Sequence, residues 1–66
     1  MKGVDIVADL IAPWVQVKRV ETGIKHGGLF IIVYFRKAAH FKSYFAEDKE
    51  TARRIKEVKI KCEQRQ

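Results

Sequence analysis

Residues 29–35 form an uninterrupted run of seven apolar or aromatic side chains, and this run limits most strongly how the chain can fold. Gly27 and Gly28 precede the run, and Arg36 and Lys37 follow it. An apolar run of roughly four to eight residues between such breaks is typical of a buried strand. Because the run does not alternate with polar residues, both of its faces need cover, as in the middle strand of a sheet.

Two further segments predict strands on either side of the middle one. In residues 14–20, Val15 and Val17 alternate with polar residues, which is the pattern of a strand with one wet face. Aromatic and polar side chains alternate again in residues 40–45. The three segments together predict a three-stranded antiparallel sheet over residues 14–46.

The connection between the first two strands is rich in glycine. Gly27 and Gly28 supply the positive φ that a tight hairpin turn requires, so we expect the first strand to return antiparallel. The first strand either stops near Glu21 or continues through Ile24 with a bulge at Gly23.

Helical patterns precede and follow the predicted sheet. Apolar residues at helical spacing predict a short helix within residues 1–13, which Pro13 ends because the residue before a proline avoids the helical region. This segment either covers the sheet or is an arm that orders on a partner. A second helix is expected over residues 47–63, with either Asp48 or Glu47 just before it as the cap of its first turn. Its apolar side chains form one stripe: Ala52, Ile55, Val58 and Cys62.

The 66 residues therefore predict one small α+β domain, with a short N-terminal helix, a three-stranded antiparallel sheet and a C-terminal helix packed on one face. A domain of this size buries only about 60% of the surface of its unfolded chain, so a partner can complete the core. The single cysteine, Cys62, cannot form an internal disulfide, which favours a cytoplasmic location. No apolar run approaches the roughly 18 residues that span a bilayer, so no membrane partner is expected.

The charge is unevenly distributed along the chain. Fourteen Lys and Arg against eight Asp and Glu give a net charge of +6. Residues 15–46 carry six basic side chains against Glu21 alone, a net +5, whereas residues 1–14 carry −1 and residues 47–66 carry +2. This excess points to a polyanionic partner, nucleic acid before an acidic protein surface, and places the positive field on the predicted sheet.

Catalytic and metal-binding chemistry is not expected. His26 and His40 have no cysteine or carboxylate at metal-ligand spacing. Ser43 lies in a strand pattern without the glycine elbow of a nucleophilic serine. Gly27-Gly28 lacks the further glycines and the Lys-Ser/Thr of a phosphate loop. We therefore expect a non-catalytic protein without a cofactor.

The candidate site is the sheet face that the C-terminal helix leaves open. A narrow ribbon of strands can enter the major groove of DNA, where Arg and Lys meet phosphates or guanine edges and an aromatic lies against sugar or a thymine methyl. A solvated sheet whose lysines only maintain solubility is the alternative. Tyr34 is a core residue if it faces the helix and a contact residue if it faces outward. The predicted contacts are Lys18, Lys42 and Tyr44, with Arg36 and Lys37 at the rim.

Several short motifs add a family resemblance over residues 22–58. Gly23-Ile24 and Gly27-Gly28-Leu29-Phe30 lead into the long strand, and residues 40–45 lead into an acidic, alanine-containing helix start at residues 47–52. These features resemble the three-stranded-sheet DNA-binding domain of two related groups. One is the arm-site-binding domain of phage and transposon tyrosine integrases; the other is the Apetala-type domain of plant transcription factors and phage homing endonucleases. The resemblance implies a sheet inserted in the major groove, with contacts from Lys25, Arg36, Lys37, Lys42 and Tyr44.

Two alternatives remain beside this interpretation. The helix–three strands–helix order also resembles a double-stranded-RNA-binding domain, in which residues 48–53 take the place of that family's Lys-Lys-x-Ala-Lys cluster. A small phage- or plasmid-type protein that binds and modulates another protein, or pairs with itself, would instead use the apolar sheet face. The sequence thus predicts non-catalytic binding of double-stranded DNA, accessory to recombination or regulation, with these two alternatives.

Overall fold

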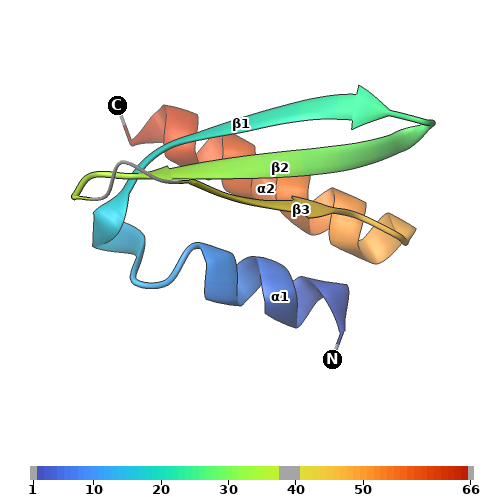
Figure 1. The fold of residues 1–66 in the computed structure, drawn as a ribbon, viewed down its shortest axis with the longest axis horizontal. Helices are drawn as coiled ribbons and strands as arrows, with labels where there is room; N and C mark the ends of the chain where they lie inside the picture. The colour runs from blue at the N-terminus through green and yellow to red at the C-terminus, as the bar shows by residue number, and fades with distance from the viewer. Residues whose placement is uncertain (1, 38–40, 66) are drawn as a thin grey trace.

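The computed structural model describes residues 2–37 and 41–65, and its elements alternate helix and sheet as expected. An N-terminal helix precedes a three-stranded antiparallel sheet, and a longer helix follows it (Figure 1). This confirms the predicted α+β class. In chain order the elements are α1 (Gly3–Leu10), a 3₁₀ turn η1 (Trp14–Gln16), β1 (Val17–Lys25), β2 (Gly28–Phe35), β3 (Phe41–Phe45) and α2 (Lys49–Gln64).

The apolar strand β2 lies in the middle of the sheet, which has the order β1-β2-β3. Ile31 and Val33 are fully buried on one side of β2, whereas Phe30, Ile32 and Tyr34 on the other side are only half-buried. The two faces of the strand are therefore covered unequally, although the sequence is apolar on both. The prediction of a central strand is confirmed, and one of its faces remains partly open.

The β1–β2 hairpin differs from the sequence expectation in its details. The turn consists of His26 and Gly27, with φ of 53° and 77°, while Gly28 already pairs with Lys25 as the first residue of β2. A two-residue turn with positive φ at both positions matches the right-handed twist of the flanking strands. The strand continues past Glu21 and Gly23 pairs regularly with Phe30, so both alternatives, a stop near Glu21 and a bulge at Gly23, are wrong.

The irregularity in β1 lies nearer to its start. The register shifts between Val17 and Arg19, which leaves Lys18 without a directly opposite residue in β2. Residues 14–16, expected to be extended, form the 3₁₀ turn η1 instead. The first strand therefore begins later than predicted and runs to Lys25. At the other end of the sheet, His40 lies outside the described residues, and β3 begins at Phe41.

Both helices pack on the same face of the sheet. α2 crosses β1 and β2, and α1 lies beside α2 along β3 (Figure 1). Val7 of α1 is fully buried in the same core cluster as Ile31 and Ile55. The N-terminal segment is thus part of the core, and the alternative of a detached arm is wrong.

The long helix α2 is fixed at both of its ends. The side chain of Asp48 accepts a hydrogen bond from the backbone N–H of Thr51, 2.7 Å away, as an N-cap. Near the other end, the guanidinium of Arg65 donates to the carbonyl oxygens of Trp14, at 3.1 Å, and of Val17. None of the helices in the described residues is long and apolar enough to cross a membrane.

The buried stripe of α2 follows the predicted spacing. Ile55, Val58 and Cys62 are at most 2% exposed, and Ala52 packs at the border of the core. Thr51, which the spacing did not include, is also buried. The single apolar stripe faces the sheet, and the rest of the helix is mostly charged, with Ile60 as an exposed apolar residue.

Candidate interface on the open sheet face

Strand pairing defines which side chains lie on the face opposite the helices. Directly paired residues of an antiparallel sheet point to the same side, and neighbours along a strand point to opposite sides. Because Ile31 and Val33 point toward the helices, the residues between and beside them point away. We call the resulting surface the open face; its three cross-strand rows are Arg19–Tyr34–Phe41, Glu21–Ile32–Ser43 and Gly23–Phe30–Phe45, followed on β1 by Lys25.

Two predicted contact residues lie on the wrong side of the sheet. Lys42 pairs with Val33, and Tyr44 pairs with Ile31, so both point to the face that the helices cover. Tyr44 packs against the core, and the ammonium of Lys42 lies 5.8 Å from the ring centre of Phe35. The prediction that these two side chains lie on the open face is therefore wrong. The alternation in residues 40–45 assigns the side chains to two opposite faces of the strand. It does not indicate which of these faces packs against the helices.

The other predicted contacts are spread along one edge and one end of the sheet. Lys25 lies on the open face at the far end of β1. Lys18 is exposed at the register shift of β1, where pairing does not fix its side. Arg36 and Lys37 are exposed just beyond β2, and the Nε of Arg36 donates to the carbonyl of Val15 at 3.2 Å. The structure does not gather the six predicted residues into one site.

The centre of the open face is apolar and aromatic. Phe41 is 57% exposed and Phe45 is 40% exposed, and the half-buried Phe30 and Ile32 lie between β1 and β3. None of these residues was among the predicted contacts. The signal in the sequence was the alternation of Phe41, Ser43 and Phe45, which places three residues on one side of a strand.

Two of the phenylalanines lie across strand glycines. A methyl group placed on Gly23 would come within 2.5 Å of the Cζ atom of Phe30, and one on Gly28 would overlap the ring tip of Phe45. Each ring therefore leans sideways over the neighbouring strand instead of standing upright on the sheet. An aromatic ring that covers a glycine supports a strand position that otherwise packs poorly. The glycines of the hairpin thus determine how the aromatic side chains lie on the open face.

A shallow hollow of about 260 Å³ opens beside these rings. Phe41 and Phe45 bound it along β3, with Ser43 between them, and Lys25 closes its β1 side. Phe30, Ile32 and Tyr44 complete the lining, which is mostly apolar and aromatic, with the hydroxyl of Ser43 and the ammonium of Lys25 as polar groups.

Charged groups occupy the border of the open face. The guanidinium of Arg19 lies 4.2 Å from the ring centre of Tyr34 and 3.6 Å from the carboxylate of Glu21. The hydroxyl of Tyr34 donates to the same carboxylate at 3.1 Å. The acidic group of the face is thus already engaged by two partners. Lys25 at the hairpin end of the face and Arg36 beyond the opposite end of β2 add an exposed positive charge at each end of the aromatic centre.

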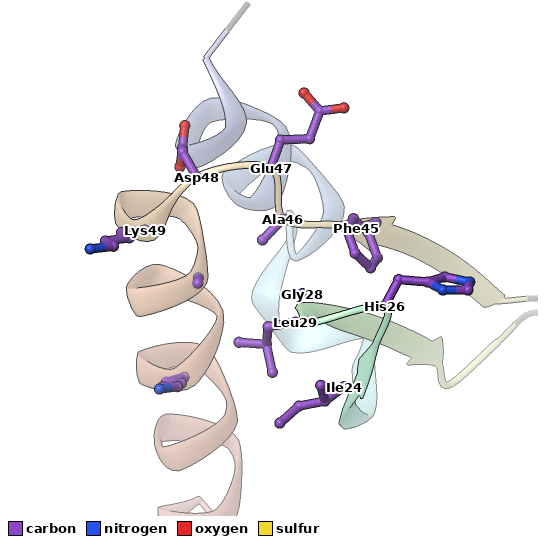
Figure 2. Close-up of a pocket in the computed structure, with 12 residues that line it drawn as sticks. Ile24, His26, Gly28, Leu29, Phe45, Ala46, Glu47, Asp48 and Lys49 are labelled. Carbon is purple, nitrogen blue, oxygen red and sulfur yellow. The ribbon is translucent and has the colours of Figure 1, made fainter.

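A second hollow, of about 620 Å³, lies where the tip of the hairpin meets the start of α2 (Figure 2). Its lining mixes charges, because Glu47 and Asp48 lie close to Lys49 and Lys56. Hydrogen bonds from the side chain and the backbone of Thr51 hold the pKa of Asp48 below its ordinary value of 3.8, so this cap is ionised at neutral pH. A site with both signs of charge is less suited to a polyanion than the open face is.

No metal centre accompanies either hollow. Within residues 2–37 and 41–65, no group of three or more His, Cys, Asp or Glu side chains is placed to hold an ion. Cys62 is buried against the core as a free thiol. Comparisons with protein-family models, with curated proteins and with solved structures found no match for this chain.

Proposed function

We propose that this chain binds nucleic acid, without catalysis, through the open face of its sheet. The observation that supports this most is the aromatic centre of that face, bordered by basic side chains, in a chain of net charge +6. The proposal keeps the function expected from the sequence, with double-stranded DNA as one candidate ligand. It keeps the predicted contact Lys25 and adds Arg19, and it drops Lys42 and Tyr44 because these two point to the helices.

The basic and the aromatic side chains of the open face would contact different parts of a nucleic acid. Basic side chains at a border neutralise phosphates and release counterions, which supplies affinity and makes it dependent on salt. Aromatic side chains at a centre contact sugars or bases, which phosphates do not offer. Lys25 and Arg36 lie at two separate places on the border, so a strand of phosphates can pass along the face between them.

Lys25→Ala tests the face directly, with Lys42→Ala as a matched control. Both changes remove one ammonium from the sheet, but only Lys25 lies on the open face. In fluorescence anisotropy titrations of labelled DNA at several salt concentrations, Lys25→Ala should weaken binding and reduce the salt slope by about one phosphate contact. Arg36→Ala should act in the same direction as Lys25→Ala, and Lys42→Ala should change both quantities less. Equal effects of Lys25→Ala and Lys42→Ala would count against the open face.

A protein partner is the second candidate, favoured by the exposure of Phe41 and Phe45. An apolar patch rimmed by charge is also the composition of a protein interface. Such a partner would need acidic groups opposite Lys25 and Arg36. The same titrations separate the candidates, because a protein-binding face would give no saturable DNA or RNA binding at low salt.

Duplex RNA is a third ligand to include in the titrations. The helix–three strands–helix order is present, and Lys49, Lys56 and the hairpin residue His26 line one hollow. If duplex RNA binds there, Lys56→Ala should weaken it and Lys25→Ala should not. That result would move the nucleic-acid site away from the open face.

A further inference from the structure

We infer that the ligand of the open face is a single strand of nucleic acid whose bases stack on Phe30, Phe41 and Phe45. This inference rests on the proposed function and names its substrate class. The exposed parts of these rings lie on one surface formed by β2 and β3. Stacking on aromatic side chains is the main way in which proteins bind unpaired bases.

The orientation of the phenylalanine rings is the first observation that supports base stacking. Phe30 and Phe45 lean across Gly23 and Gly28, so their rings lie along the sheet. A side chain at either glycine would push the ring away from this position. Phe41, which is the most exposed of the three, tilts at 46° to the ring of Tyr34, with the ring centres 5.7 Å apart. The rings are therefore held in place before any ligand arrives.

The polarity of the centre is the second support. Reading a duplex through its grooves requires hydrogen-bond donors and acceptors that meet base edges. In the rows Glu21–Ile32–Ser43 and Gly23–Phe30–Phe45, the polar side chains are Ser43 and Glu21. The carboxylate of Glu21 is engaged by Arg19 and Tyr34, so the hydroxyl of Ser43 is the polar group beside Ile32, Phe30 and Phe45. Such a centre offers ring surface instead of edge contacts, and in a duplex only the ends expose the faces of the bases.

The hollow beside the rings is the third support. Its volume of about 260 Å³ leaves room for one base, whose ring system is similar in size to an indole. Lys25 stands at its border, where the phosphate attached to that base can be neutralised. Ser43 supplies a hydroxyl that can donate to or accept from a base edge.

The charge of the open face favours a nucleic-acid strand over a second copy of this chain as its ligand. An isologous pair would bring Lys25 and Arg36 of two chains into one interface, and each chain already carries +6. Glu21, the acid of the open face, is engaged by Arg19 and Tyr34 in its own chain. A phosphodiester backbone complements the same border.

The test compares one labelled DNA strand of mixed sequence, free of self-pairing, with the same strand annealed to its complement. The full chain should bind the free strand at least tenfold more tightly than the duplex in anisotropy titrations. Phe41→Ala should weaken binding of the free strand by roughly 5- to 100-fold, the range that loss of one base stack gives. Ile60→Ala, which removes an exposed apolar side chain from α2, is the matched control and should leave the affinity unchanged.

A second variant gives a readout besides affinity. Phe41→Trp keeps an aromatic ring at the exposed position, so it should retain binding, and its fluorescence should be quenched when a base stacks on it. The native Trp14, beside Lys61 and Arg65 at the far end of α2, provides the background signal in the unmodified chain. Circular dichroism of each variant shows whether the fold is retained.

The outcomes distinguish this inference from the proposed function. Equal or tighter binding of the duplex would overturn the single-strand inference and leave nucleic-acid binding in place. Undiminished binding of the free strand by Phe41→Ala would overturn the stacking. Absence of binding to either DNA at low salt would overturn both. A dimer seen by sedimentation without DNA, and abolished by Phe41→Ala, would assign the face to a second copy.

Discussion

Asp48 is the residue at which the sheet gives way to α2. Its carboxylate accepts from the backbone N–H of Thr51, and the bond satisfies one of the free N–H groups of the first helical turn. The side chain of Thr51 is almost fully buried, so the cap also anchors the start of α2 to the core. The charge of a single carboxylate therefore stabilises the junction on which the helix position depends.

The stability of the chain should fall in acid partly through Asp48. Because the pKa of this carboxyl is lower in the folded chain than its ordinary value of 3.8, ionisation favours the folded state. That contribution is fully present above pH 3.8 and is lost as the pH falls through the lower, folded value. In thermal unfolding followed by circular dichroism, Asp48→Ala should lower the melting temperature at pH 7 more than Asp48→Asn does, because asparagine still accepts the hydrogen bond.

The difference in melting temperature between the unmodified chain and Asp48→Asn should narrow below pH 3.8. Asp5→Asn, on α1 and away from the cap, is the control for general charge effects. A difference that stays constant down to pH 2.5 would show that the carboxylate is not the group responsible.

At the scale of elements, the sequence predicted the order, type and pairing of the strands. The apolar run of β2 gave its central place, and the alternation of residues 40–45 gave a strand at β3. Which side chains of β3 point toward the helices could not be predicted. The neighbouring strand β2 is apolar on both faces, so its sequence does not indicate which face the helices cover. The helices pack on the face that carries Ile31 and Val33. Their partners in β3, Tyr44 and Lys42, therefore point to the same face.

The two phenylalanines of β3 lie on the open face, whereas large apolar side chains usually face the core. Phe45 has Gly28 beneath it, so part of its ring is covered by the sheet itself. The register shift at Lys18 was equally hidden, because no glycine or proline marks it. The outward position of Phe45 and the register shift at Lys18 both depend on contacts between strands. The pattern of residues along a single strand carries no information about such contacts.

The packing of α1 on α2 depends on a close approach at Gly3. A methyl group at this position would overlap the hydroxyl of Thr51, whose side chain is buried. Gly3→Ala should therefore destabilise the chain by about 1–3 kcal/mol, although alanine favours a helix by up to about 1 kcal/mol over glycine.

A double-mutant cycle in urea separates these two effects. Thr51→Ala removes the overlapping atoms, so Gly3→Ala should cost less in that background than in the unmodified chain. Additive effects of the two substitutions would mean that the helices do not meet at Gly3.

For the whole molecule, the core is one thin layer between the sheet and two helices. Its fully buried residues come from both helices and from β1 and β2. A chain of this size has an unfolding free energy of roughly 3–10 kcal/mol. The loss of one buried side chain therefore removes a large share of the total.

Val7→Ala should lower the unfolding free energy by about 2 kcal/mol, because it removes two buried methyl groups and leaves a cavity. Val15→Ala removes the same atoms from a side chain that is 71% exposed, and its effect should stay within about 0.5 kcal/mol. Urea unfolding measures both. Equal, small effects would mean that α1 does not contribute to the core in solution.

Lys59 and Arg65 bear on whether a further strand can be added to the sheet. They donate to the carbonyl oxygens of Val20 and Val17 in the edge strand β1, so side chains of α2 and of its C-cap residue occupy main-chain acceptors there. The opposite edge of the sheet is the five-residue strand β3. Growth of a fibril by addition of strands needs two available edges on every subunit. Because Lys59 and Arg65 occupy acceptors in the first half of the β1 edge, a strand added along that edge would have to displace both side chains. Addition at β3 alone joins two chains without extending a polymer.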